Sequence, residues 1–405
     1  MTKVSTIGKS CNITTGKLDA NCAVNGGEYP FFTCSALPAA INNYAFDDDV
    51  VLIAGNNAQG NFHVSRYKGK FNAYQRTYVL TAKLGYSLDY IYYFLKLELK
   101  RLKEHSQGSQ TKFLTKPILT NIVLRNLDYG EQQQIAAVLS SIDQKIEINN
   151  RINAELEAMA KTLYDYWFVQ FDFPDENGKP YKSSGGKMVY SKELKREIPA
   201  GWSIVPIEYY ADIIDPHLSH RAPEETQVGF PFAGIGDIDS EGNISIDKAR
   251  VIAEDFVLKQ EGDYEINQYS LGYGRVGTVG KVVKLRKQKF RYALSPTLAV
   301  INPKESKHAG YVYRCVKDKI FFQNVLKNTS GTTRPAIGIQ QLRKIPVLKP
   351  GIAHNAMFAE FENFTKVLFD KSSKINMESQ SLIELRDWLL PMLMNGQVRV
   401  GIVQF

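Results

Sequence analysis

The longest uninterrupted helical pattern of this chain spans residues 131–170, which read EQQQIAAVLSSIDQKIEINNRINAELEAMAKTLYDYWFVQ. Apolar side chains recur at intervals of three or four residues from Ile135 to Leu163, as on one face of an α-helix. No proline or glycine interrupts the stretch. At about 1.5 Å per residue, it predicts a helical rod on the order of 55 Å long. Asn149 falls on the apolar face, where a buried amide can fix the register of a partner helix at some cost in stability.

The chain contains the same order of segments twice. The first block ends with Gly108-Ser109-Gln110, and Gly108 lies fourteen residues before Ile122. A diverged copy ends with Gly331-Thr332-Thr333, and Gly331 again lies fourteen residues before Ile345. Earlier pairs are Tyr29-Pro30-Phe31-Phe32 with Phe230-Pro231-Phe232, and the glycine loop Gly55–Gly60 with Gly272–Gly277. Two similar but non-identical modules suggest two similar but non-identical targets held at a fixed distance.

Both blocks have the punctuation of strand-rich domains, with β-branched or aromatic runs bounded by turn residues. The first block also contains one amphipathic helix, predicted over Leu88–Lys103. The second block, from Trp202 to about Leu348, is predicted to repeat the strand-rich pattern. The predicted strands include Val50–Ile53, Thr77–Leu80, Lys281–Leu285 and Thr297–Ile301.

A second helical region starts near His354 and is predicted to end near Pro391. Neither long helix would be stable as a lone exposed rod, so the two most simply pack antiparallel on each other. The predicted fold class is α+β, with two similar strand-rich recognition domains separated by two long antiparallel coiled-coil helices, as an internal repeat related by a pseudo-twofold. The predicted segments are the first block (1–128), a helical region (129–173), a connector (174–201), the second block (202–349), a second helical region (350–395) and a tail (396–405).

The net charge is compatible with a nucleic-acid partner, although many soluble proteins reach such a charge without one. The 405 residues carry a formal charge of +8 and a pI near 9.0, which suits a polyanion. No run of 18 apolar residues is present, and we expect no membrane span and no secretory signal. The four cysteines form no CxxC pair and suit neither a disulfide framework nor a zinc site. We therefore expect a reduced, cytoplasmic location and no metal.

Three motifs of cofactor or metal sites occur in the wrong context. Gly272–Gly277 (GYGRVG) matches the dinucleotide pattern GxGxxG, but a strand-like run follows instead of the helix that would receive a pyrophosphate. It is typical of a glycine hairpin, or of a loop that lets backbone approach a phosphate or base edge. Phe232–Gly236 (FAGIG) resembles a methyltransferase loop for S-adenosylmethionine, again without the helix. His217 and His220 have metal-like spacing but no third ligand nearby. We expect no catalytic site and no bound cofactor.

Two polar loops occupy matching places in the two blocks, Ser106–Lys112 (SQGSQTK) and Ser330–Arg334 (SGTTR). Glycine permits close approach, Gln and Thr can read base edges, and Lys or Arg can pair with a phosphate or guanine. A plain surface hairpin is the alternative. The predicted DNA contacts are Ser106, Gln107, Gly108, Ser109, Gln110, Lys112, Lys68, Arg76, His220, Arg221, Arg275, Lys281, Arg291, Ser330, Gly331, Thr332, Thr333 and Arg334.

The helix ends resemble a known family, the specificity subunits of type I restriction-modification enzymes. The similar stretches are Glu131–Leu139 (EQQQIAAVL), Leu156–Ala160 (LEAMA), Leu163–Phe168 (LYDYWF), Phe171–Pro174 (FDFP) and Glu197–Trp202 (EIPAGW). In layout the resemblance covers essentially the whole chain. The distal helix departs from the first copy, because it lacks the EQQQIA opening and the YWF run.

The resemblance implies a non-catalytic subunit in which each block reads one half of a split, asymmetric DNA site and the helices set the gap. Two modification subunits, which bind S-adenosylmethionine and methylate adenine N6, and two motor-nuclease restriction subunits, which use ATP, would be its partners. We expect helix pairing and partner docking at Ile135, Leu139, Ile142, Asn149, Leu156, Leu163, Trp167, Leu382, Leu385 and Leu389.

Two other classes of function remain open from the sequence. A self-contained nucleic-acid methyltransferase would bind S-adenosylmethionine as an isolated chain. A coiled-coil scaffold would show no salt-dependent affinity for DNA. A DNA mimic is disfavoured, because a mimic must be acidic and this chain has a charge of +8.

Overall fold

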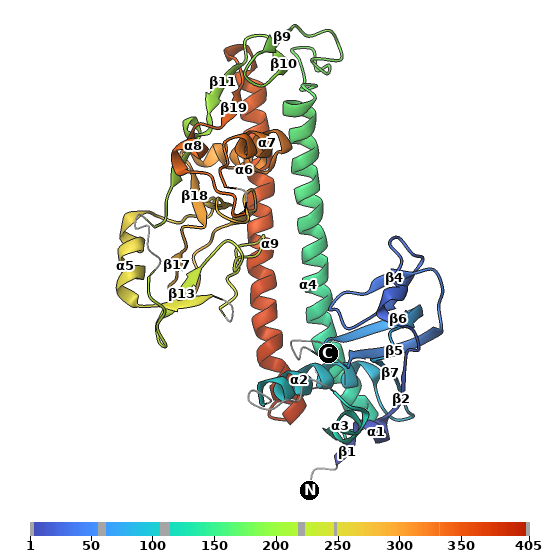
Figure 1. Cartoon of the computed structure of the whole chain (residues 1–405). Coiled ribbons are helices and arrows are strands. Elements are labelled where there is room, and N and C mark those ends of the chain that lie inside the picture. The colour runs from blue at the N-terminus through green and yellow to red at the C-terminus, as the bar shows by residue number, and fades with distance from the viewer. Residues whose placement is uncertain are drawn as a thin grey trace. The chain divides into compact units, whose positions relative to one another are not determined.

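Two long helices, α4 (Tyr129–Tyr164) and α9 (Asn355–Asn395), each run without a break (Figure 1). The chain divides into two units: unit 1 comprises Met1–Ile148 with Ser379–Phe405, and unit 2 comprises Asn149–Glu378. Because this division cuts both helices, each unit contains one block and a segment of each helix. The computed structural model describes residues 4–55, 62–105, 114–217, 223–246, 249–331 and 333–401.

The prediction of a long helix from about residue 131 is confirmed by α4, which a turn of π-helix over Asp165–Val169 extends. Helix α9 ends at Asn395, four residues beyond the predicted end near Pro391 and at the predicted bound of the second helical region. Pro391 removes one backbone hydrogen-bond donor from the helix, but the residues after it still form the last turn of α9. Leu393 and Met394 are buried in the core of unit 1 beside Leu139, and this burial offsets the local cost of the proline.

In unit 2 the helix segments run antiparallel. The Nδ2 of Asn149 donates to Glu378 (2.9 Å), and the amide of Asn153 donates to that of Asn376. One to two turns further along α4, Leu156 and Ala160 pack against Leu368. Residue numbers therefore rise on α4 as they fall on α9. The predicted stripe position of Asn149 is confirmed as buried.

In unit 1 the order of contacts is the same. Arg386 of α9 donates to Asp143 of α4 at 2.9 Å. Nearer the start of α4, Ile135 and Leu139 share a core with Leu393. The antiparallel pairing predicted from sequence thus holds within each unit.

Unit 1 is built on a six-stranded sheet in the order β2-β7-β5-β6-β3-β4. The first and last strands of the block, β1 (Val4–Thr6) and β8 (Val123–Arg125), pair separately as an antiparallel ribbon. Helix α2 (Leu88–His105) confirms the predicted helix. The remaining elements are α1 (Ile7–Ser10), β2 (Cys11–Thr15), η1 (Ala20–Cys22), β3 (Tyr29–Phe32), β4 (Ala39–Ile41), β5 (Phe46–Ala54), β6 (Val64–Ala73), β7 (Thr77–Ala82) and α3 (Lys116–Asn121).

Unit 2 has a four-stranded sheet, β12-β18-β15-β16, and a three-stranded sheet, β14-β13-β17. Strands β11 (Ser203–Pro206) and β19 (Pro346–Lys349) pair as the ends of the block, and the connector forms the hairpin β9 (Met188–Ser191) and β10 (Arg196–Pro199). The other strands are β12 (Ala211–Ile214), β13 (Phe230–Ala233), β14 (Arg250–Ile252), β15 (Leu271–Gly274), β16 (Val282–Lys284), β17 (Ala293–Leu294) and β18 (Leu298–Pro303). The helical elements between them are η3 (Ile207–Tyr209), α5 (Glu254–Asp263), η4 (Ser306–His308), α6 (Ala309–Lys317), α7 (Lys319–Lys327), α8 (Ile339–Arg343) and η5 (Ile352–His354).

The internal repeat is confirmed by strand pairing. The order β2-β7-β5-β6 in unit 1 corresponds to β12-β18-β15-β16 in unit 2, and in each block the strand with the Pro-Phe motif, β3 or β13, pairs parallel to its neighbour. The equivalent of β6 is interrupted in unit 2, where residues 285–292 separate β16 from β17. The second block also contains helices α5, α6 and α7, which were not predicted from the sequence.

Aromatic residues at the end of α4 form the centre of the unit 2 core. The rings of Phe168 and Phe361 lie 4.8 Å apart, and Trp167 is 5.7 Å from Phe361. Phe173 stacks on Trp202 at 5.3 Å. All rings of the LYDYWF and FDFP stretches except that of the exposed Tyr166 are therefore buried against α9 and the start of the second block. Among the residues described, no helix has the length and apolar character needed to cross a lipid bilayer.

Helix α6 approaches α9 so closely that only glycine fits at position 310. A Cβ built on Gly310 would overlap the side chain of Thr365. We expect Gly310→Ala to lower the free energy of unfolding by about 2 kcal/mol through overpacking, measured by urea denaturation. The matched control is Gly262→Ala in α5, where a Cβ meets nothing within 4 Å. Equal stability of the two variants would contradict the close approach.

His354 is held neutral at the start of the second helical region. The indole Nε1 of Trp202 donates to its Nδ1 at 3.1 Å, and burial lowers the pKa of His354 below its ordinary value, although Glu176 opposes the shift. Because its pKa is lower in the folded than in the unfolded chain, neutral His354 stabilises the fold above about pH 6.5, and this stabilisation is lost as the pH falls. We expect the free energy of unfolding to drop less steeply from pH 7.5 to 5 in His354→Phe than in the wild type, measured by urea denaturation at each pH. Parallel pH profiles would refute this.

Candidate nucleic-acid interface

Two loops of the second block that the sequence predicted to contact DNA lie against each other. Residues 275–277 follow β15, and residues 330–336 precede α8. The amide of Gly277 donates to the carbonyl of Pro335 (2.8 Å), and the amide of Ile337 donates to that of Arg275 (2.9 Å). An isolated bridge also pairs Val276 with Ala336. The backbone of one loop therefore positions the other.

The loop that starts at Ser330 is closed by its own backbone. Ser330 and Ala336 exchange two hydrogen bonds of 2.9 and 2.8 Å. Gly331 has φ +86°, and a Cβ there would lie 2.8 Å from the carbonyl oxygen of Arg334, so this turn favours glycine. Ser330, Gly331, Thr333 and Arg334 are all exposed, while Thr332 lies outside the described residues. The loop thus presents a small, polar and basic surface beside Gly277.

Arg275 and Lys281, also predicted as DNA contacts, have partners within the second block. Arg275 donates to Asp215 at 2.7 Å. The Nζ of Lys281 donates to the carbonyl oxygens of Ile235 and Ile238, at 2.7 and 3.0 Å. The two bonds of Lys281 hold the turn after β13 in place. Contact of Arg275 or Lys281 with DNA stays a prediction. A DNA phosphate would have to compete with Asp215 or with these two carbonyl oxygens for the same hydrogen-bond donors.

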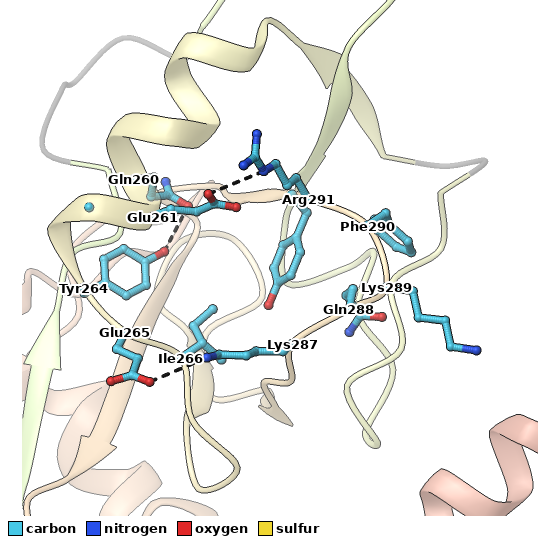
Figure 2. Close-up of a pocket in the computed structure, with 12 residues that line it drawn as sticks. Gln260, Glu261, Tyr264, Glu265, Ile266, Lys287, Gln288, Lys289, Phe290 and Arg291 are labelled. Carbon is cyan, nitrogen blue, oxygen red and sulfur yellow. Dashed lines mark hydrogen bonds and ion pairs between the residues drawn. The ribbon is translucent and has the colours of Figure 1, made fainter.

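The third predicted cation of this block, Arg291, borders a cavity of about 600 Å³ between α5 and residues 287–292 (Figure 2). It pairs with Glu254 (2.7 Å) and Glu261 (3.7 Å). Across the cavity, Lys287 pairs with Glu265 at 3.6 Å. Much of the positive charge of this loop is therefore balanced by the acidic residues of and next to α5.

In the first block the predicted cations Lys68 and Arg76 are exposed, on β6 and in the turn before β7. Lys68 faces Asp49 across the strand pair. Arg66, which was not predicted from the sequence, binds Asp49 and donates to Asp89 of α2 at 2.7 Å. Its acidic partners lie far apart in sequence, so only the alternation along β6 could have signalled it.

The remaining predicted contacts of the first block, Ser106–Lys112, and two of the second, His220 and Arg221, lie outside the described residues. Their flanks are informative for the first block. The amide of Leu114 donates to the carbonyl of Gly55 at 3.1 Å, as that of Ile337 does to Arg275. Leu114 and Ile337, which follow the two stretches in the sequence, therefore occupy equivalent positions in the two blocks, as the sequence repeat predicted.

The residues predicted for helix pairing and docking fall into two groups. Ile135, Leu139, Ile142, Asn149, Leu156 and Trp167 are buried within their units, so they serve packing. Leu163, Leu382 and Leu389 are partly buried, and Leu385 is 43% exposed. Leu385 is the one exposed member of this set, and Trp388, one turn later on α9, is 54% exposed.

The described part of the chain offers little for a cofactor or metal. Gly272 and Gly274 lie within strand β15 and lead into the β15–β16 hairpin, not into a helix N-terminus. In the FAGIG stretch the amide of Gly234 donates to Asp237 at 2.8 Å, which closes a turn. Among the residues described, no group of three or more His, Cys, Asp or Glu side chains could hold a metal ion.

Comparisons with known proteins agree with one another. The family described as type I restriction modification DNA specificity domain matches residues 2–158. The type I restriction enzyme EcoDI specificity subunit of Escherichia coli is 28% identical over 411 residues, which cover 94% of this chain and 86% of that protein. The MjaIX specificity subunit of Methanocaldococcus jannaschii is 27% identical over 327 residues, 78% of this chain and 71% of that one.

A solved structure shares the fold. The S subunit of a type I restriction-modification system from M. genitalium superposes with a TM-score of 0.55 at 15% identity, over 97% of this chain and 96% of that one. The fold of this chain is therefore shared with a solved structure along nearly the full length of both chains.

Proposed function

We infer that this chain, a member of the type I restriction-modification specificity-subunit family, is the DNA-reading component of such an enzyme. The observation that carries the inference is the sequence relation to a named specificity subunit over 94% of the chain. The internal repeat supports it, because the two blocks share strand pairing but differ in their loops and inserted helices. The chain is a targeting subunit, not the catalyst.

Each block reads one half of a bipartite, asymmetric DNA site in this proposal. In the second block, base edges are met by the exposed loop of Ser330–Arg334, which Gly277 and its neighbours hold in place. The first block uses the equivalent loop, Ser106–Lys112. Exposed cations such as Lys68 and Arg76 contribute contacts to phosphate, which position the protein without reading sequence.

Catalysis belongs to other subunits of the assembly. Two modification subunits bring S-adenosylmethionine and methylate adenine N6, and two restriction subunits use ATP to move and cleave DNA. The exposed apolar pair Leu385 and Trp388 of α9 is a candidate contact for one of them. The complex works on cellular DNA, so the proposal places the chain in the cytoplasm.

Mapping methylated adenines across the genome of the source cell tests the bipartite site. We expect one motif of two short specific parts separated by a fixed stretch of unspecified bases, with the half-sites about one helical turn (~34 Å) apart. Deleting the gene for this chain should abolish that methylation. One continuous short motif, or methylation that persists after deletion, would contradict the proposal.

Replacing Arg334 by Ala tests the recognition loop. We expect the complex to bind its mapped site about tenfold more weakly, and the slope of log K against log salt to flatten by about one unit if a phosphate contact is lost. Fluorescence anisotropy over a salt series measures both. Lys192→Ala, an exposed lysine in the turn of the β9–β10 hairpin, is the control. Unchanged affinity in Arg334→Ala would remove this residue from the interface.

A further inference from the structure

A buried lysine of the second block contacts helix α9. Lys284 ends β16, and its side chain is 7% exposed. Its Nζ lies 3.2 Å from the carboxylate of Glu241 and 3.3 Å from the hydroxyl of Ser372 on α9. The ring of Phe369, one turn earlier on α9, lies 5.3 Å from the same nitrogen. A charged group this deeply buried is costly unless its partners stay in place.

The carboxylate of Glu241 extends the contact to both long helices. It accepts a hydrogen bond from Asn376 of α9, whose side-chain oxygen in turn accepts from Asn153 of α4. Glu241 is itself held by its turn, since the carboxylate of Asp239 accepts from the backbone amides of Glu241 and Asn243, both at 2.9 Å. A continuous polar chain therefore joins α4, α9 and the second block. We name Lys284, Glu241 and Asn376 the polar clamp.

A second polar contact ties the block to α4. Glu157 of α4 accepts from Lys317 of α6 at 2.6 Å and from Arg314, whose side chain is 5% exposed. Burial acts to raise the pKa of Glu157, but the two cations outweigh it and lower the pKa. Together with the close approach at Gly310, these contacts fix the block against both helices.

A polar seam of this kind resists displacement in a way that an apolar seam does not. Apolar side chains can slide or rotate past one another at little cost, whereas a shift here would leave a buried ammonium or carboxylate without a partner. Buried charges are weak contributors to stability, but they can specify one arrangement over others. The polar clamp thus selects one angle of the second block on the helix segments of unit 2.

That angle is transmitted to the recognition loop through the sheet. Lys284 pairs with Leu271 of β15, and β15 leads directly into Arg275–Gly277, which is bonded to the loop that starts at Ser330. We propose that Lys284, Glu241 and Asn376 are positioning residues that set how the second block presents its reading loop, and so restrict the length of the gap between half-sites. This rests on the proposed function.

The test compares spacer selectivity. The full complex is bound to duplexes that carry the mapped site with its natural gap or with a gap one base pair longer or shorter. In the double variant Glu241→Gln with Lys284→Met, both charges of the buried pair are removed together, and the guanidinium of Arg286, 3.6 Å from Glu241, keeps a neutral amide as its neighbour. We expect its preference for the natural gap, as a ratio of dissociation constants, to fall about tenfold. Asn376→Leu keeps the ion pair and the contact of Lys284 with Ser372, but removes the hydrogen bonds that join Glu241 through Asn376 to Asn153, and should lower the ratio several-fold.

The matched control is Glu265→Gln with Lys287→Met, the same exchanges at an exposed pair of the same block, 76–77% exposed. We expect any change of affinity in this control to be the same for every duplex, so the ratio should stay unchanged. Thermal melting verifies that each variant is folded at the assay temperature. If the double variant is unfolded, Asn376→Leu alone tests the positioning role. Folded clamp variants with a ratio within twofold of the wild type overturn the positioning role. A wild-type complex without preference for any gap overturns the proposed function instead.

Discussion

The pairing of α4 with α9 is the constraint on which both units depend. Neither block closes its core alone: in unit 1, Leu139 of α4 packs with Leu393 of α9, and in unit 2, Phe168 packs on Phe361. Polar side chains then restrict the register of an otherwise apolar contact, through Asp143 with Arg386 in unit 1 and the Asn153–Asn376 pair in unit 2. Apolar area provides most of the favourable free energy, while the buried polar pairs penalise alternative alignments.

Sequence periodicity was sufficient to predict the parts of the fold that follow a regular pattern along the chain, namely the first long helix and the repeat of the two blocks. The spacing of apolar residues located α4, and the repeated Gly-to-Ile distance matched Leu114 of the first block to Ile337 of the second. It failed where tertiary contacts override local preference. Helix α6 contains Tyr311, Val312, Tyr313 and Val316, which favour strands, yet all four are buried around a helical backbone. Pro391 indicated an end for α9, but packing of the following turn prevailed.

The candidate site shows the same limit at the level of single charges. Composition gives a surplus of positive charge but does not tell which cations have partners in the protein. The partners of Arg275 and Lys281 are Asp215 and two backbone carbonyls more than 40 residues away in sequence. Arg334 could be located because its loop has a counterpart in the first block. The cations most useful for nucleic acid are thus those whose neighbours leave them exposed, and exposure is a property of the folded chain.

The position of the C-terminal segment in unit 1 affects the order in which the protein can be completed. Arg125 donates to the carbonyl oxygens of Leu393 and Met394, which lie 268 and 269 residues later in the chain. At roughly 5–20 residues per second, synthesis of the chain between Arg125 and Leu393 takes tens of seconds. The N-terminal block therefore emerges from the ribosome that much earlier than the segment that covers its core. Throughout that interval Ile135 and Leu139 lack this cover, so nascent chains have a window in which chaperones, or premature association with other chains, compete for the same apolar surface.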